Sequence, residues 1–143
     1  MIAVDSSVLI DLLGEDSRAA AAEACLRLAL GEGRVVVCEV VVSEVTAGLG
    51  QGADVMDTLE DMGLHFSAVE QRAAVRAGEM QRRYNERSRA ATTRAEAPAT
   101  HRTIPDFIVG AHALLQCSAL ITRDAGFFRD YFKGLKVIVP KAA

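Results

Sequence analysis

The fold is decided by the first ten residues of the chain, MIAVDSSVLI (Met1–Ile10). The apolar run over residues 2–4 predicts a buried strand that ends at Asp5, and the two serines after it begin a helix through about Leu13. In open parallel α/β sheets, ligand sites form in the crevice beyond the carboxyl ends of the strands. Asp5 is therefore either the N-cap of the helix or a metal ligand or catalytic acid. Further acids at the same edge would favour the second interpretation.

The same alternation of short apolar runs and helical periodicity continues along the chain. It predicts an α/β fold with a mostly parallel central sheet of about four to five strands and helices on both faces. The order of the strands does not follow from this pattern. Residues 90–102 contain Pro98 and lack apolar periodicity, so we expect a mobile loop or a frayed extension of the preceding helix. Strands are predicted at 2–4, 34–38, 64–66, 119–121 and 136–139, and helices at 6–13, 18–30, 40–49, 54–62, 70–89, 104–117 and 127–132.

Length and composition bound the class of protein. The 143 residues suit a single domain, residues 1–143. Half of the residues are hydrophobic and only 5% are aromatic, so we expect an aliphatic core. The longest apolar cluster, Val35–Val42, is too short to span a bilayer and no signal peptide is recognised, which predicts a cytoplasmic protein without a membrane partner. Three cysteines without a CxxC pair indicate neither a disulfide framework nor a zinc site.

Charge is distributed unevenly along the chain. Residues 1–69 carry 12 acids and 3 bases, whereas residues 70–102 carry 4 acids and 8 arginines. An acidic half beside an arginine-rich segment suggests a metal-binding cluster next to a phosphate-contacting surface. For any single arginine, a solvated helix face explains the charge equally well.

Four acids are candidates for one site. Asp5 and Asp124 each follow a predicted strand, Glu44 lies on the apolar side of a helix, and Asp106 lies in the first turn of another. Each has a structural alternative: an N-cap for Asp5, a solvated position for Glu44, a capping box Thr103-x-x-Asp106, and an Asx-turn for Asp124. Because the carboxyl ends of parallel strands meet at one edge, a shared acidic pocket is geometrically natural.

Such a pocket is costly without a cation. Two carboxylates about 4 Å apart repel by roughly 4 kcal/mol at an effective dielectric of 20. Several hard oxygen ligands are what Mg²⁺ or Mn²⁺ requires, and such ions activate water for displacement at phosphorus. This is nuclease chemistry. The three histidines lie apart, and no glycine-rich phosphate loop or dinucleotide fingerprint occurs.

Five stretches of the chain resemble the PIN-domain ribonucleases, and especially the VapC-type toxins of bacterial toxin–antitoxin pairs. Val4–Ile10 looks like the family's opening, and Val42–Val45 (VSEV) like its second acidic motif. Ile104–Ala113 (IPDFIVGAHA) closely resembles the third motif. Leu120–Phe127 followed by Tyr131–Leu135 resembles the fourth motif and the family's tail. The resemblance therefore runs in order over essentially the whole chain.

The resemblance implies a PIN fold and a Mg²⁺- or Mn²⁺-dependent endoribonuclease. It also implies a homodimer, an RNA substrate whose cleavage inhibits translation, and a VapB-like antitoxin that wraps or plugs the site. Residues 90–102 form a longer segment than the family pattern leads us to expect, which affects the entrance of the cleft. By this resemblance the catalytic acids are Asp5, Glu44, Asp106 and Asp124, the metal ligands are Asp5, Asp106 and Asp124, Ser7 is auxiliary, and the expected RNA-backbone contacts are Arg76, Arg82, Arg83 and Arg87.

Two other interpretations remain open. One is a PIN-fold protein that binds RNA or a partner without cleaving, and a cleavage assay separates it from a nuclease. The other is an α/β signalling domain of the receiver type with an acidic Mg²⁺ pocket. That type needs paired acids after the first strand and a lysine after a late strand, and neither Lys136 nor Lys141 fits well.

Overall fold

The computed structural model describes residues 1–14, 17–50, 52–93 and 102–141. In these residues the strands form one parallel sheet in the order β3-β2-β1-β4-β5, which confirms the predicted α/β fold. The strands are β1 (Ile2–Val4), β2 (Val35–Val37), β3 (His65–Phe66), β4 (Ala119–Ile121) and β5 (Val137–Ile138). The helices are α1 (Ser6–Leu13), α2 (Ala19–Glu32), α3 (Glu39–Leu49), α4 (Gly52–Asp61), α5 (Gln71–Thr93), α6 (Ile104–Gln116) and α7 (Ala125–Tyr131).

The centre of the sheet is β1, which pairs with β2 on one side and with β4 on the other. All residues of these three strands are buried, as the continuous apolar runs predict for parallel strands. In the register between β1 and β4, Val4 lies opposite Ile121. The residues that follow these two strands are therefore neighbours at the carboxyl edge of the sheet.

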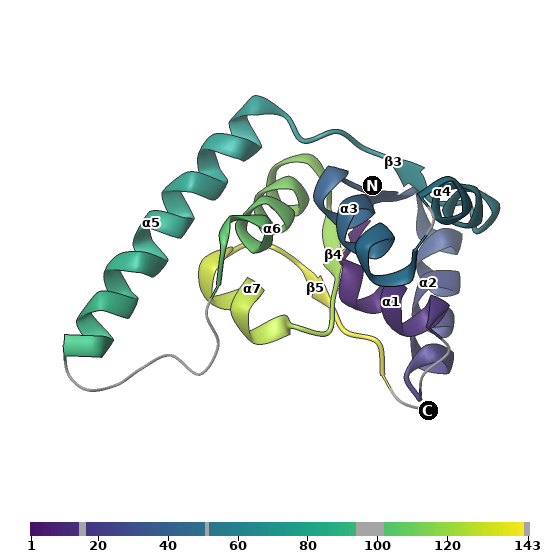
Figure 1. Cartoon of the computed structure of the whole chain (residues 1–143), viewed down its shortest axis with the longest axis horizontal. Helices are drawn as coiled ribbons and strands as arrows, with labels where there is room; N and C mark the ends of the chain where they lie inside the picture. Colours follow the sequence, from purple (N-terminus) through teal and green to yellow (C-terminus); the bar gives the residue numbers. More distant parts are fainter. Residues whose placement is uncertain (15–16, 51, 94–101, 142–143) are drawn as a thin grey trace.

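The helices gather in two groups, with α1–α4 on the right of Figure 1 and α5–α7 on the left. The long helix α5 lies alongside α6, and its apolar face is formed by Ala73, Ala77 and Tyr84, which are buried. It extends to Thr93, beyond the predicted end at residue 89. Of the segment 90–102, for which a loop or frayed helix was predicted, residues 94–101 lie outside the described residues. No helix in the described ranges is long and apolar enough to cross a membrane.

The core is aliphatic around the sheet but aromatic under α7, so the expectation of a wholly aliphatic core is wrong. The rings of Phe107, Phe127, Phe128 and Phe132 pack together, with centroids between 5.0 and 6.4 Å apart for the pairs in contact. Few aromatic residues are present, but most of them gather in this one cluster. Composition gives their number and carries no information about where they meet.

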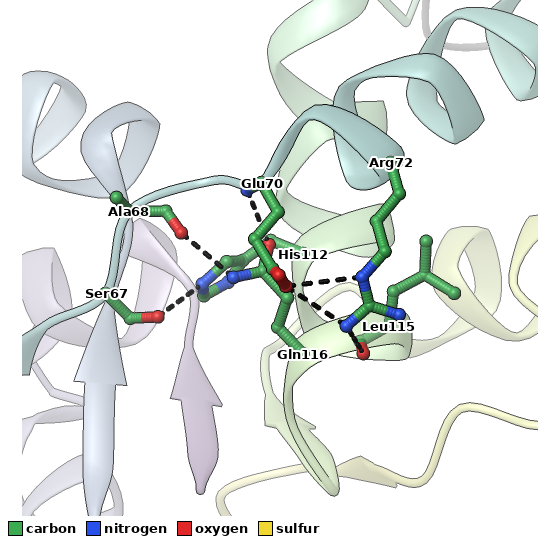
Figure 2. Close-up of polar contacts among 7 residues, drawn as sticks. All are labelled: Ser67, Ala68, Glu70, Arg72, His112, Leu115 and Gln116. Carbon is green, nitrogen blue, oxygen red and sulfur yellow. Dashed lines mark hydrogen bonds and ion pairs between the residues drawn. The ribbon is translucent and has the colours of Figure 1, made fainter.

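The connection from β3 to α5 is fastened to α6 by side-chain hydrogen bonds (Figure 2). Gln116 donates to the carbonyl oxygen of Ala68 (2.9 Å) and accepts from the backbone N–H of Glu70 (2.9 Å). Nε2 of the buried His112 lies 3.1 Å from the Ser67 hydroxyl. These contacts fix α5 on α6 at the point where the chain crosses over the sheet.

The buried His112 should make stability depend on pH. Burial lowers the pKa of His112 below its ordinary value of 6.5, although Glu39, Glu70 and the bond to Ser67 oppose the shift. The unfolded chain therefore takes up this proton first, so the contribution is complete above pH 6.5 and is lost as the pH falls through that value. Each pH unit below it costs up to about 1.4 kcal/mol until the lowered pKa is reached. Urea unfolding of wild type and His112→Gln at about pH 7.5 and pH 5.5 tests this. The difference in the free energy of unfolding between wild type and His112→Gln should shrink at the lower pH. An unchanged difference would contradict the prediction.

Candidate acidic site at the carboxyl edge of the sheet

Asp5 has two roles in the structure. As the N-cap of α1, its Oδ1 accepts a hydrogen bond from the backbone N–H of Ser6 (2.9 Å). Its Oδ2 accepts from the hydroxyls of Thr122 (2.8 Å) and Ser7 (3.3 Å). Capping therefore uses one carboxylate oxygen and leaves the other facing the end of β4. The N-cap interpretation is correct for Asp5 and does not exclude a functional role.

Glu44 reaches the same place from α3. The buried Val41 and Val45 fix this helix against the core, so that Glu44 lies half-buried at its edge. Its Oε1 accepts a hydrogen bond from the hydroxyl of Ser6 (3.0 Å). Ser6 thus connects Glu44 to Asp5 through its backbone N–H and its side chain. The sequence interpretation singled out Ser7 and missed Ser6, because the partner of Ser6 is far away in the chain.

Asp106 lies in the first turn of α6 and is half-buried. Its backbone N–H donates to the carbonyl oxygen of Thr103 (3.1 Å), which is the N-cap, but the Thr103 side chain makes no capping hydrogen bond. The capping box that was the structural alternative for Asp106 is therefore not formed. The negative charge of the Asp106 carboxylate instead raises the pKa of Asp5 and Glu44.

Electrostatic coupling joins three of the acids. Burial raises the pKa of Asp5, hydrogen bonds from Thr122, Ser6 and Ser7 oppose the shift, and the carboxylate of Asp106 raises it further. Burial also raises the pKa of Glu44, against the hydrogen bond from Ser6, and the charges of Asp5 and Asp106 add to the increase. The charged forms of Asp5 and Glu44 are therefore destabilised in the protein without a cation.

Asp124 is attached to this group through Thr122. The buried hydroxyl of Thr122 donates to Asp5 and accepts from the backbone N–H of Asp124 (3.0 Å). Asp124 is the N-cap of α7 without a side-chain capping bond, and its carboxylate pairs with the guanidinium of Arg102. The adjacent Arg123 turns the other way and binds the buried Asp11 of α1 (2.6 Å). The sequence interpretation missed Thr122, although it stands in the same short motif as Asp124.

The donor set suits a hard divalent cation. Carboxylate and hydroxyl oxygens are the ligands that Mg²⁺ and Mn²⁺ prefer, and mutual repulsion among Asp5, Glu44 and Asp106 is relieved by positive charge. In the described part of the chain, no three His, Cys, Asp or Glu side chains are already grouped to hold a metal ion.

The four arginines of α5 that are expected to contact RNA fall into two sets. Arg76, Arg83 and Arg87 line a cavity of about 310 Å³ together with Lys133, which follows α7. The guanidinium of Arg87 lies 5.1 Å from the ring centroid of Tyr131, another lining residue. Arg82 is not among the residues that line this cavity, and its exposed side chain pairs with Glu86 (3.4 Å). Lys133 was not among the candidate residues of the sequence interpretation.

Replacing Asp5 should stabilise the metal-free protein. In Asp5→Asn the cap remains through Oδ1, and the hydroxyls of Thr122 and Ser7 can accept from the amide. The raised pKa means that native Asp5 binds its proton more tightly than the ordinary value of 3.8 implies. Stability therefore falls as the pH rises from 3.8 to the raised pKa of the folded protein. We expect the variant to melt higher in EDTA near neutral pH, by roughly 2–4 °C per kcal/mol removed. The gain should vanish as the pH falls through the raised pKa, and a lower melting temperature in EDTA would contradict this.

Comparison with known proteins agrees with the fold. The sequence pattern of the PIN domain family matches residues 2–133. The chain belongs to the PIN domain family. No curated protein sequence matches it.

Solved structures with the same fold include toxin–antitoxin proteins. VapBC2 of Rickettsia felis, solved with a DNA fragment from its promoter, has a chain that is 13% identical with a TM-score of 0.71, covering 99% of this chain and 100% of that chain. VapC20 of Mycobacterium tuberculosis, a Sarcin-Ricin loop cleaving toxin, is 16% identical with a TM-score of 0.64, covering 95% and 99%. A toxin–antitoxin complex of Klebsiella pneumoniae has a chain that is 20% identical with a TM-score of 0.62, covering 100% of both. At these identities, the likeness establishes the PIN fold.

Proposed function

We propose that this PIN-domain protein is a metal-dependent endoribonuclease, a single domain over residues 1–143 that acts in the cytoplasm. The observation that carries the proposal is the electrostatic coupling of Asp5, Glu44 and Asp106 at the carboxyl edge of β1, with Asp124 attached through Thr122. Two acids whose pKa is raised by burial and by neighbouring carboxylates, beside a basic surface, suit cleavage of a polyanion assisted by a cation.

The chain supplies ligands and the groups that hold them in position. Asp5, Asp106 and Asp124 would hold one or two Mg²⁺ or Mn²⁺ ions. Such an ion supplies charge stabilisation at phosphorus and activation of the attacking water. Ser7 and Thr122 keep Oδ2 of Asp5 in place. Ser6 occupies Oε1 of Glu44, which leaves Oε2 to serve as a further ligand or to orient a water molecule.

The RNA backbone would bind in the basic cavity between α5 and α7. Arg76, Arg83 and Arg87 share one face of α5, and Lys133 faces them, which provides positive charge for phosphates. Arg82 lies outside this cavity and would contact RNA only at the exposed side of the helix. Most aromatic rings are packed in the core under α7, which disfavours base stacking as the main grip. Recognition would then depend on RNA shape or on a few loop contacts.

The proposal extends to the protein's partners. A toxin of the VapC type would act as a homodimer, inhibit translation by cleaving RNA, and be neutralised by a VapB-like antitoxin. Support comes from the five resembling motifs and from the shared fold with chains of toxin–antitoxin complexes. The alternative, a PIN-fold protein that binds RNA or a partner without cleaving, is disfavoured by the presence of all four acids.

The direct test is cleavage of total cellular RNA by purified protein that has been freed of any bound partner. We expect discrete fragments with Mn²⁺ or Mg²⁺ and none with EDTA, because the acids need the cation to act. Sequencing the fragment ends would identify the target. Absence of cleavage with both ions would favour the alternative that binds without cleaving.

A further inference from the structure

One cation of the chain lies inside the acidic site. Arg102 precedes α6, and its guanidinium pairs with Oδ2 of Asp124. The arginine side chain is only 19% exposed, against 37% for its aspartate partner, so most of it is removed from water. An exposed arginine–carboxylate pair is worth little, but one that is largely removed from water is screened less and is stronger.

Arg102 is held from two helices. Its guanidinium carbon lies 4.5 Å from the ring centroid of Phe127 in α7, a cation–π contact. Its backbone N–H donates to the hydroxyl of Tyr84 (3.0 Å), and its carbonyl oxygen accepts from Gln81 (3.4 Å), both in α5. The residue therefore has a defined position at the site, set by four contacts and not by the pairing with Asp124 alone.

The pairing singles out one of the four acids. Within the described residues, Arg102 is the partner of Asp124, whereas Asp5 and Glu44 are bonded to serine and threonine groups and have no cationic partner. Asp124 is also the acid that does not contribute to the raised pKa of Asp5 or of Glu44. Among the residues that the structure describes, Asp5, Glu44 and Asp106 thus have no ion-pair partner, whereas the charge of Asp124 is balanced by Arg102.

We propose that Arg102 is an internal counter-ion that competes with the divalent cation for Asp124. Arg102 pairs with the Asp124 carboxylate in the metal-free protein and leaves it when the ion binds. The inference rests on the proposed function, because it assumes that Asp124 is a ligand. A guanidinium stays protonated at all ordinary pH values, so the competition depends on the concentration of the ion. Any ligand that must displace a resident partner binds with a reduced apparent affinity.

The test is Mn²⁺ binding measured by calorimetry on wild type and Arg102→Gln. We expect the variant to bind Mn²⁺ about tenfold more tightly, which corresponds to about 1.4 kcal/mol. Arg102→Met, which keeps an aliphatic stem on Phe127, should show the same gain if the glutamine variant folds poorly. Arg27→Gln removes an exposed arginine of α2 that pairs with Glu23 and should leave the affinity unchanged. In an Asp124→Asn background, Arg102→Gln should have no further effect on affinity.

Melting in EDTA gives an independent readout. Arg102→Gln should melt lower than wild type without metal, because it loses the ion pair and the contact with Phe127. It should then gain more than wild type on addition of Mn²⁺. Equal or weaker Mn²⁺ binding by the folded glutamine and methionine variants would overturn the role of Arg102 and leave the nuclease proposal standing. Failure of wild type and variants alike to bind Mn²⁺ would overturn both proposals, whereas binding by the variants alone would support the competition.

Discussion

Asp106→Asn is expected to abolish metal-dependent cleavage of RNA, with a loss of about 10³-fold or more, comparable to removal of an essential stabilising group in other enzymes. Asp106 is the acid whose charge raises the pKa of both Asp5 and Glu44, so its carboxylate is close enough to act on both. The fold should be unaffected, because the backbone N–H of Asp106 keeps its bond to the carbonyl oxygen of Thr103 in the variant.

The measurement is a single-turnover cleavage rate at saturating Mn²⁺, with melting curves in EDTA for both proteins. Removing one of three repelling charges should leave the metal-free variant at least as stable as wild type. Asp57→Asn serves as the matched control, because Asp57 is exposed on α4. This variant should cleave RNA at the wild-type rate. A rate for Asp106→Asn within tenfold of wild type would show that the site is assigned wrongly.

Gly110→Ala is expected to lower the free energy of unfolding by about 3 kcal/mol, the upper end of ordinary overpacking. A Cβ at this position would lie 2.2 Å from Cε2 of Phe132, closer than any real contact. Phe132 is buried and cannot move away, because Phe107, Phe127 and Phe128 surround it. The higher helix propensity of alanine offsets only about 1 kcal/mol of this cost.

Urea unfolding followed by circular dichroism measures the effect. Gly78→Ala is the matched control, because Gly78 also lies inside a helix but a Cβ there meets nothing within 4 Å. That variant should be as stable as wild type or more stable by up to about 1 kcal/mol. Equal midpoints for wild type and Gly110→Ala would mean that the aromatic cluster is loose. The glycine of the third motif is thus explained by packing one turn beyond Asp106.

Several elements follow from local sequence. The strand before Asp5 and the helix that starts near Pro105 are predicted because apolar periodicity, caps and proline position act over a few residues. The order β3-β2-β1-β4-β5 could not be predicted, since it depends on pairing between strands far apart in the chain. Strand β3 is shorter than predicted, and both of its residues are exposed at the edge of the sheet.

The acids of the site were predictable, but the groups that hold them were not. Acidic residues that directly follow predicted strands are recognisable as site candidates by their position, and the third and fourth motifs resemble those of a known family. Ser6 and Thr122 lie in the first and fourth resembling stretches, but the local sequence does not show which acid either one contacts, and Arg102 lies outside those stretches. Their roles depend on partners brought together by the fold. Leu49 shows the same limit, since it continues the spacing of Val41 and Val45 yet is much more exposed at the end of α3.

The bond between Thr122 and Asp5 spans 117 positions in the chain. The same separation holds for the pairing of β1 with β4, in which Val4 lies opposite Ile121. Contacts at such separation are the slow ones in folding. The proposed site is therefore complete only after the two central strands have paired, which makes its assembly a late step of folding.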